Sequence, residues 1–484
     1  MSEMNSRDAA GNGMPLPVTR TSMQSFADDP VAMMRKLKAE HGDVACIEDE
    51  QAKAFFVFHP KWNQFLLSQP QLFHSRFFAI RGSRRSAQRK LTEGLLSMND
   101  DQHRRHRRMV KEPFSRKSIG SYSSTIQKLT SELLAGWQVG KTVDINSEMT
   151  HYMLRLTSAL LFGIDHPEKA YAIGEKIDTW VRYNHRLGPM AFGSHPDLAN
   201  EYEDMLAYGE ELEDMIREFI TMKRDQLASR GDGPAEDVLS LLLAAHDAEG
   251  EINEDQLVGH VTLLFAAAHL TTAHTFTWTH MLLSQHPDVA TSLLQEIETT
   301  LGSSVPEMSD FARLPLLDRV LKESMRIMPA SSYSQRTNVA PVDLGPFKLA
   351  PGSAIIFSQF MTHHREDFYP EPERFLPERW LTCSPPPYAY LPFGAGPRMC
   401  VGAGLAMQIL MTAMPMIMQK FRLSLIADTS IEAKVISTML NPMLPVMMSI
   451  NEQDGAYSEV NVKGNIHSLV EFPSRIGSRK KMVA

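Results

Sequence analysis

Apolar residues in the middle of the chain recur with the period of a helix, and few β-branched runs interrupt them. The clearest predicted helix begins after Asn253, whose side chain can cap it with Gln256 as its partner, and ends at Gln285, before Pro287. About 32 residues at 1.5 Å each give a helix roughly 48 Å long. Because residues 261–268 are apolar on nearly every side, we expect this helix to cross the centre of the molecule, covered all round.

Strand patterns lie on both sides of the helical region. Residues 43–48 and 53–60 are short apolar runs with a polar turn between them, so they predict a small N-terminal sheet. Residues 342–357 alternate short apolar runs with Gly-Pro and Pro-Gly turns, which predicts further short strands.

Two more helices are predicted late in the chain. One begins at Pro315, a favoured first-turn position, and runs to residue 328. The other spans residues 405–418, is apolar and contains Pro415, so we interpret it as a buried helix with a kink. The patterns together predict a mainly α protein with small β-sheets and a β-rich N-terminal lobe.

The 484 residues contain no linker-like or repetitive stretch that would divide them. We therefore expect one domain over residues 1–450, with a polar segment at 1–30 and an extension of unknown role at 451–484, interpreted as peripheral. No run reaches the roughly 18 apolar residues of a membrane span. A net charge of −8 argues against nucleic acid as the main partner, and three cysteines cannot form a disulfide framework, which indicates a reducing, cytoplasmic setting.

The segment at residues 393–402 carries the most specific chemistry. Cys400 lies just before a predicted helix, after a loop that contains Gly394 and Gly396. Glycines allow the backbone to approach a bulky group, and a helix N-terminus stabilises a thiolate. Arg398 adds a cation suited to a carboxylate. Read alone, Cys400 is equally consistent with an ordinary buried thiol.

The spacing Phe-x-x-Gly-x-Arg-x-Cys-x-Gly resembles the haem-binding signature of the cytochrome P-450 family, soluble bacterial members in particular. The matching residues are Phe393, Gly396, Arg398, Cys400 and Gly402. The resemblance implies that haem b binds in this loop, with Gly394 beside it and Cys400 as the axial thiolate of the iron. It also implies the family's fold, in which the long central helix lies over the haem.

A second motif lies upstream in the order that the family shows. Glu323 and Arg326 resemble its Glu-x-x-Arg helix, and Arg379 lies in a segment that resembles the Phe-x-Pro-x-Arg pattern. By resemblance, the three side chains form a buried ion-pair network that supports the thiolate loop. Independently of the family, Glu and Arg three residues apart share one helix face. For an isolated Glu-x-x-Arg, a surface pair would be the better interpretation.

Residues 103–108 are His-Arg-Arg-His-Arg-Arg. By resemblance, His103 and Arg107 contact the haem propionates, and Arg336 and Arg398 are the other propionate candidates. The remaining arginines of the run would then face outward, where they form either a solvated basic face or a docking surface for an acidic electron donor.

The central helix departs from the family's pattern. Members usually carry Ala/Gly-Gly-x-Asp/Glu-Thr-Thr, and this chain has Ala267, Ala268, Leu270, Thr271 and Thr272 at the matching positions. Thr271 and Thr272 are kept as catalytic candidates, and Ala268 takes the place of the glycine beside the haem. The acid that relays protons in the family is replaced by leucine, which has no proton to pass.

His274 is a candidate substitute for that acid. It follows Leu270 by four residues, hence lies on the same helix face, and histidine titrates near neutral pH. A histidine that is hydrogen-bonded to a neighbouring backbone group or that borders another helix is the commoner outcome.

The resemblance implies a haem-thiolate monooxygenase that inserts one oxygen atom of O2 into a hydrophobic small molecule of fatty acyl, terpenoid or polyketide type. The chain has no nucleotide fingerprint and no iron–sulfur cysteine set, so separate donors are implied, a ferredoxin or flavodoxin with its reductase. The expected substrate pocket includes Ala267, Leu270, Tyr333 and Leu440. Because of Leu270, peroxide-driven oxidation or rearrangement stays open as an alternative, as does a non-catalytic haem-thiolate sensor.

Overall fold

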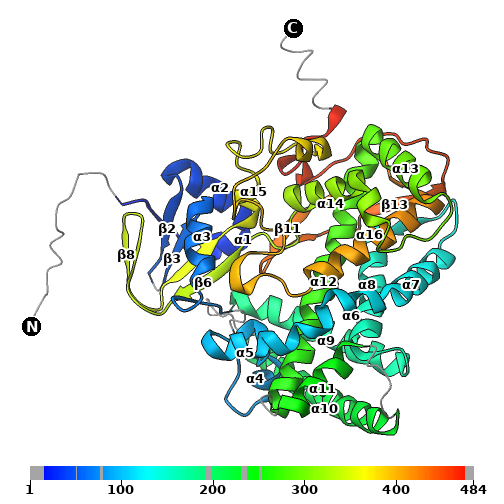
Figure 1. Cartoon of the computed structure of the whole chain (residues 1–484). Coiled ribbons are helices and arrows are strands. Elements are labelled where there is room, and N and C mark those ends of the chain that lie inside the picture. The colour runs from blue at the N-terminus through cyan, green and yellow to red at the C-terminus, as the bar shows by residue number, and fades with distance from the viewer. Residues whose placement is uncertain are drawn as a thin grey trace, which may run out of the picture.

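A β-sheet lobe lies at one side of the molecule, and helices fill the other side (Figure 1). The structure is a computed structural model that describes residues 16–50, 52–76, 80–190, 198–230, 237–249 and 253–474. The mainly α architecture with small sheets predicted from the sequence is confirmed. Of the polar segment 1–30, residues 1–15 lie outside the described residues, and the rest contributes a short strand and a short helix.

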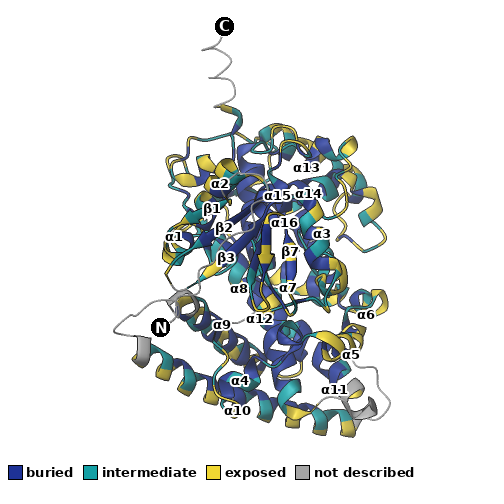
Figure 2. Cartoon of the chain, turned by 90° about the vertical axis from the view of Figure 1, so that its left-hand side faces the viewer, coloured by how far each residue is buried: buried dark blue, intermediate teal, exposed yellow. Residues whose placement is uncertain are grey.

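The helices surround one long central member. In chain order they are α1 (Met23–Asp28), α2 (Pro30–His41), α3 (Pro60–Ser68), α4 (Ala87–Leu91), α5 (Asp100–Val110), α6 (Arg116–Ser121), α7 (Ser123–Gly136), α8 (Ile145–Phe162), α9 (Pro167–Met190), α10 (Leu198–Arg230), α11 (Val238–Glu249), α12 (Glu254–Gln285), α13 (Pro287–Leu301), α14 (Pro315–Ile327), α15 (Gln359–His363) and α16 (Ala403–Lys420). Buried residues fill the centre, whereas α10 keeps an exposed outer face (Figure 2).

The largest sheet has the strand order β1-β2-β3-β9-β6-β4 and joins N-terminal strands to strands from beyond residue 330. Its members are β1 (Val18–Arg20), β2 (Val44–Glu48), β3 (Lys53–Val57), β4 (Phe73–His74), β6 (Ser334–Asn338) and β9 (Ala354–Phe357). The predicted strand pair at 43–60 is confirmed, with β2 antiparallel to β3. Because β6 lies next to β4, the sheet brings Arg336 close to the chain that leads into α5.

The smaller sheets border the helical side. One has the order β10-β13-β5, and the other two are the pairs β11-β12 and β7-β8. Their strands are β5 (Thr142–Asp144), β7 (Val342–Leu344), β8 (Phe347–Leu349), β10 (Phe421–Leu425), β11 (Ala433–Ile436), β12 (Met439–Pro442) and β13 (Met447–Glu452).

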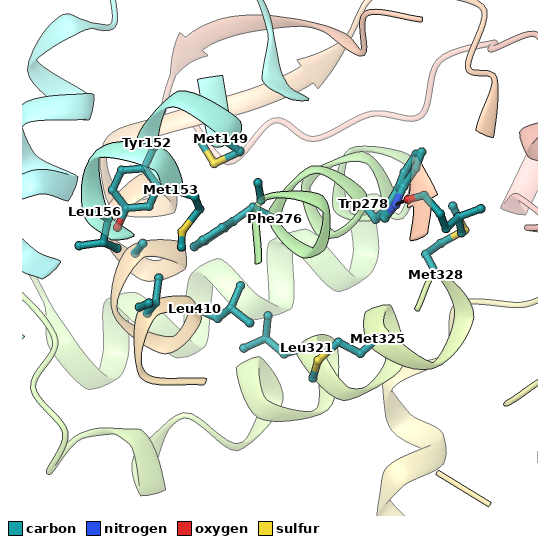
Figure 3. Packing of buried hydrophobic residues seen from close by; sticks show 14 of the residues in the cluster. Met149, Tyr152, Met153, Leu156, Phe276, Trp278, Leu321, Met325, Met328 and Leu410 are labelled. Carbon is teal, nitrogen blue, oxygen red and sulfur yellow. Dashed lines mark hydrogen bonds between the residues drawn. The ribbon is translucent and has the colours of Figure 1, made fainter. Parts of the chain in front are cut away.

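The helix α12 forms the centre of the fold, as its apolar pattern predicts. Its N-terminus carries the predicted capping box, in which Asn253 and Gln256 each bond to the other's backbone N–H. Figure 3 shows Phe276 and Trp278 of this helix among buried side chains of α8, α14 and α16. Contacts on several sides explain why an apolar helix without a polar stripe is stable here.

The end of the chain differs from the peripheral extension that the sequence suggests. Residues 451–474 pack into the same core, with Ile466 and Phe472 almost fully buried. The backbone of Ile431 donates to the Lys463 carbonyl oxygen over 2.9 Å, which joins the segment to the chain before β11. Its apolar residues are few and irregularly spaced and so give no periodic signal. Residues 475–484 lie outside the described residues.

No helix among the described residues is long and apolar enough to cross a membrane.

Candidate active site

The loop before α16 places Cys400 at the centre of the candidate site. The backbone N–H of Cys400 donates to the carbonyl oxygen of Phe393 over 2.8 Å, which closes the loop. Gly396 has φ +72°, and a Cβ there would lie 2.2 Å from the Leu67 carbonyl oxygen at the end of α3. A side chain at position 396 would therefore clash with backbone as well as strain its own, so the spacing in the motif follows from packing.

The Cys400 thiol feels opposing influences. Cys400 keeps an exposed surface, but the protein packed around it desolvates the thiol and raises its pKa, whereas a hydrogen bond from the backbone N–H of Gly402 and the charge of Arg107 act to lower it. A Cβ at residue 402 would lie 4.0 Å from Sγ and 3.8 Å from the ring of Phe114, so glycine keeps this side of the sulfur open. These two stabilising contacts are those that a thiolate needs.

One histidine and three arginines converge beside the loop. His103 is 6% exposed, and its pKa is lowered to about 3 by burial and by the charges of Arg398, Arg107 and Arg336. Burial and the neighbouring arginines also lower the pKa of Arg398 to about 9, while burial lowers that of Arg336 to about 10. In the described part of the chain, Asp100 is the carboxylate that acts on this group. Partly buried arginines beside a buried histidine fit a ligand that brings carboxylates.

Backbone contacts fix two members of the cluster. Arg398 donates to the carbonyl oxygens of Met98 (2.7 Å) and Leu96 (3.1 Å), which ties the cysteine loop to the start of α5. Arg107 donates to the Met399 carbonyl oxygen over 2.5 Å and so lies against the residue before Cys400. The four predicted contacts to propionates are thus brought together by α5, β6 and the cysteine loop.

Glu323 on α14 lies at the centre of a buried ion-pair network. Arg326 binds both carboxylate oxygens at 2.9 Å, and Nε of Arg379 donates to Oε1 of Glu323 at 2.8 Å. Glu323 and Arg326 are both fully buried. A buried pair is favourable when its remaining groups are satisfied, and Arg326 also donates to the carbonyl oxygens of His363 and Pro372.

Two further residues join this network: Trp380, the aromatic residue that follows Arg379 in its motif, and His363, which lies in no sequence motif. Nε1 of Trp380 donates to Oε2 of Glu323 over 3.0 Å. The ring of His363 accepts from the backbone N–H of Leu391 over 2.7 Å, at the start of the cysteine loop. His363 thereby connects the network to the loop, a contact between segments that only the folded chain brings together.

The middle of α12 lies on the other side of the site. Thr271 donates to the Ala267 carbonyl oxygen over 2.9 Å and remains partly exposed, while Thr272 donates to Ala268 and is buried. Ala267 is exposed, and Ala268 and Leu270 are partly exposed. These residues therefore present a small apolar surface with one hydroxyl, that of Thr271.

His274 is enclosed between α12 and α9. It is 3% exposed, its pKa is lowered to about 4 by burial and by His269 and His185, and its Nδ1 atom is buried with no hydrogen-bond partner. Of the two commoner outcomes expected for this histidine, the backbone hydrogen bond is not formed at Nδ1, whereas the position bordering another helix agrees with the effect of His185 of α9.

The other predicted pocket residues, Tyr333 and Leu440, are more buried than residues that line an open pocket. Tyr333 packs edge-on against Phe26 with ring centroids 5.3 Å apart, and burial raises its pKa to about 12. Leu440 is 1% exposed, and its carbonyl oxygen accepts a hydrogen bond from Trp278. The neighbouring Met443 and Leu444 are the exposed apolar residues of that turn.

Comparison with known proteins decides the family. The family model described as Cytochrome P450 matches residues 12–449. The chain belongs to the cytochrome P450 family. It is accordingly a haem-thiolate oxidoreductase of the monooxygenase type.

Among P450 relatives, the chain is 28% identical to pentalenene oxygenase of Streptomyces avermitilis, over 85% of this chain and 91% of that protein. It is also 28% identical to cyclooctatin synthase of Streptomyces melanosporofaciens, over 88% of this chain and 92% of that protein. The solved structure of a retinoic acid bound cyanobacterial P450, CYP120A1, matches with a TM-score of 0.78 and 22% identity over 91% of this chain and the whole of that one. This last likeness shows the fold.

The residues present fit the P450 cofactor. Cys400 offers a sulfur ligand for iron, the backbone N–H of Gly402 and the charge of Arg107 stabilise its thiolate, and the group of His103, Arg336 and Arg398 can bind carboxylates. The sequence resemblance named these residues correctly as neighbours. It did not reveal the partners that α9 contributes behind α12, because α9 carries no family motif.

Proposed function

We propose that this P450 oxidises a terpenoid hydrocarbon or a similarly apolar small molecule, with electrons from a separate ferredoxin or flavodoxin and its reductase. P450 enzymes as a family take hydrophobic substrates and external electron donors. The observation that carries the proposal is the Cys400 cradle joined to a carboxylate-binding cation cluster. The terpenoid class rests on the two bacterial relatives that act in terpenoid oxidation by their names.

Bound haem supplies oxygen activation at an iron whose thiolate ligand favours O–O cleavage. The chain's own residues do the rest. Arg107 and the N–H of Gly402 stabilise the negative charge on Cys400, while His103, Arg336 and Arg398 hold the cofactor's carboxylates. The buried network of Glu323, Arg326 and Arg379 keeps the cysteine loop in place through His363 and the segment at residues 370–379.

The distal side orients the substrate and delivers protons. Ala267 and Leu270 offer apolar surface, and Ala268 approaches the cofactor where glycine is usual. The hydroxyl of Thr271 donates its hydrogen bond to the Ala267 carbonyl oxygen. Its lone pairs can therefore accept a hydrogen bond from water at the reacting oxygen. Thr272, although adjacent, is buried away from this surface and acts through the helix backbone.

The exposed arginines of α5 suit the docking of an acidic electron donor. Arg104, Arg105 and Arg108 all face solvent on the helix whose Arg107 reaches the cysteine loop. A cytoplasmic location, inferred from the small number of cysteines, stays a prediction.

The test is reconstitution with a ferredoxin, its reductase and NADPH, using pentalenene as the terpenoid probe and dodecanoic acid as the fatty acyl probe. We expect an oxygenated product from pentalenene and at least tenfold less from the acid. Product from the acid alone would overturn the terpenoid class. No product from either, with oxygen uptake unchanged by the donor, would overturn donor-dependent monooxygenation.

Leu270 favours a second candidate, peroxide-driven oxidation by the same site, because a peroxide brings the protons that an acid at 270 would relay. Product formation from hydrogen peroxide without donor, together with none from oxygen and donor, would establish this second function. Binding of carbon monoxide without turnover by either route would indicate a sensor.

A further inference from the structure

A polar cluster lies between α9 and α12, in the part of the molecule where apolar residues dominate. It consists of Asp178 and His185 from α9 and of His269 and His274 from α12. The two helices pack side by side (Figure 1). Asp178, His269 and His274 are 5%, 0% and 3% exposed, so their polar atoms must find partners within the protein.

The pair Asp178 and His269 holds one proton more than a neutral histidine and a carboxylate would. Nε2 of His269 lies 2.9 Å from Oδ1 of Asp178, and Nδ1 lies 3.2 Å from the carbonyl oxygen of Phe265. A carbonyl oxygen only accepts, so Nδ1 must carry a hydrogen. An ionised carboxylate also only accepts, so the second nitrogen carries one too, unless the proton is on Asp178 instead. In either form, the pair stores a proton inside the protein.

The carboxylate favours the ionised form of that pair. Burial raises the pKa of Asp178, but the hydrogen bond and charge of His269, together with Arg182, outweigh it and lower the pKa. Arg182 forms an ion pair with Asp178, and its side chain is 70% exposed. The pair thus touches solvent through one residue of α9.

The cluster continues toward the face of α12 that bears Thr271. His185 lies two helical turns beyond Asp178 on the same side of α9, and its pKa responds to both Asp178 and His269. His274 in turn responds to His269 and His185. It lies three residues beyond Thr271 and four beyond Leu270, with Nδ1 enclosed and unpartnered.

We propose that Asp178, His185, His269 and His274 form a proton conduit from solvent at α9 to Thr271, replacing the acid that the chain lacks at Leu270. The proposal rests on the proposed monooxygenation. Asp178 and His269 store the proton, His185 and His274 pass it on, and a water carries it from His274 to the Thr271 hydroxyl. The four side chains act on the reaction through Thr271 and water, so we regard them as proton-positioning residues.

The conduit carries protons only. The balanced reactions show that the oxygen-dependent route needs added protons, whereas the peroxide-driven route does not. With oxygen, RH, O2, two electrons from the ferredoxin-type donor and two protons give ROH and water. With hydrogen peroxide, RH and H2O2 give ROH and water with no added electrons or protons. Damage to the conduit should therefore reduce the oxygen route far more than the peroxide route.

The test compares His274→Gln and Asp178→Asn with His280→Gln, all in the haem-loaded protein. His280 is a matched control, because it is on the same helix, is also buried with a pKa lowered to about 4, and lies against Phe276 outside the cluster. With pentalenene, oxygen and the ferredoxin system, we expect product per NADPH to fall at least tenfold in the two cluster variants, with hydrogen peroxide released instead. The fall in peroxide-driven product should be at least fivefold smaller than the fall in oxygen-dependent product. The control should keep its product per NADPH within twofold.

Rescue separates proton delivery from simple damage. Leu270→Asp combined with His274→Gln should regain at least half of the lost coupling, because it restores an acid next to Thr271. Equal losses in both routes, or coupling within twofold of wild type in both cluster variants, would overturn the conduit.

A readout without turnover tests the stored proton. In protein labelled with ¹⁵N histidine, we expect one histidine whose two ring nitrogens both carry hydrogen, as its two acceptor partners require, lost in His269→Gln and changed in Asp178→Asn. Absence of that signal in the wild-type protein would overturn the stored proton. If wild type yields no oxygen-dependent product yet shows the signal, the proposed function fails while the proton-holding pair stands.

Discussion

The two sides of the site differ in how their residues are held. On the Cys400 side, charged groups form a network whose three ionised side chains, Glu323, Arg326 and Arg379, all come from sequence motifs. On the α12 side, the motif acid is missing at Leu270, and an acid from α9, Asp178, pairs with His269 one position away. The spacing of residues within motifs thus fixes the cofactor-binding side, whereas residues of another helix can replace a missing group on the proton-handling side.

The largest effect on stability is expected from a substitution of Glu323, in the buried network on the Cys400 side. Glu323→Gln removes the charge that neutralises two buried arginines, so we expect the free energy of unfolding to fall by about 3–5 kcal/mol. Urea unfolding with haem content measured alongside checks it. Asp318→Asn on the same helix breaks only the exposed pair with Lys322, and we expect less than about 1 kcal/mol. Similar losses in both variants would contradict a special role for the buried network.

Two glycines of the cysteine loop sharpen the comparison on the same side. Both residues have positive φ, but a Cβ at 396 meets the Leu67 carbonyl oxygen, while one at 394 has nothing within 4 Å. We expect Gly396→Ala to cost about 2–3 kcal/mol and to impair haem retention, and Gly394→Ala to cost about 1 kcal/mol. Urea unfolding of the two variants measures the difference. Equal costs would mean that backbone strain alone, and not packing on α3, fixes the loop.

Buried histidines on the α12 side predict how stability depends on pH. The pKa of His280 is lowered by burial to about 4, from about 6.5 in the unfolded chain. The unfolded state therefore binds a proton below pH 6.5 that the folded state does not bind until about pH 4. Stability is complete above pH 6.5 and falls as the pH decreases, by about 2 kcal/mol at pH 5 for this residue.

Urea unfolding of wild type and His280→Gln from pH 8 to pH 5 checks that dependence. In the variant, the free energy of unfolding should decrease less steeply with falling pH, by the slope that the uptake of about one proton on unfolding produces, whatever the variant's stability at pH 8. Parallel curves would show that His280 is protonated in the folded state.

The smallest effect is expected on the exposed face of α5. Arg105→Glu with Arg108→Glu should raise the KM for a ferredoxin about tenfold at low salt, equivalent to about 1.4 kcal/mol, and the difference should shrink at high salt. Lys348→Glu with Lys434→Glu, on exposed positions of β8 and β11, is the control. Equal effects from both pairs would indicate net charge and not a docking surface.

The sequence predicted the central helix and the strand pair at 43–60 because their periodic and capping signals are local. It also named the residues around Cys400, since the motif preserves their spacing. It missed His363 and Asp178, whose partners are 28 and 91 residues away along the chain. It also missed the packing of Ile466 and Phe472, whose apolar side chains are scattered among polar neighbours. Contacts of this kind depend on which helices and loops meet, and no local pattern encodes that.

The most direct measurement is the carbon monoxide difference spectrum of the reduced protein and of Cys400→Ala, prepared side by side. The account predicts a thiolate-type Soret band in the wild-type protein and its complete loss in the variant, because Cys400 is the sulfur that the glycine loop and Arg107 surround. A thiolate-type band that persists in Cys400→Ala, or its absence from haem-loaded wild type, would contradict the assignment on which everything else depends.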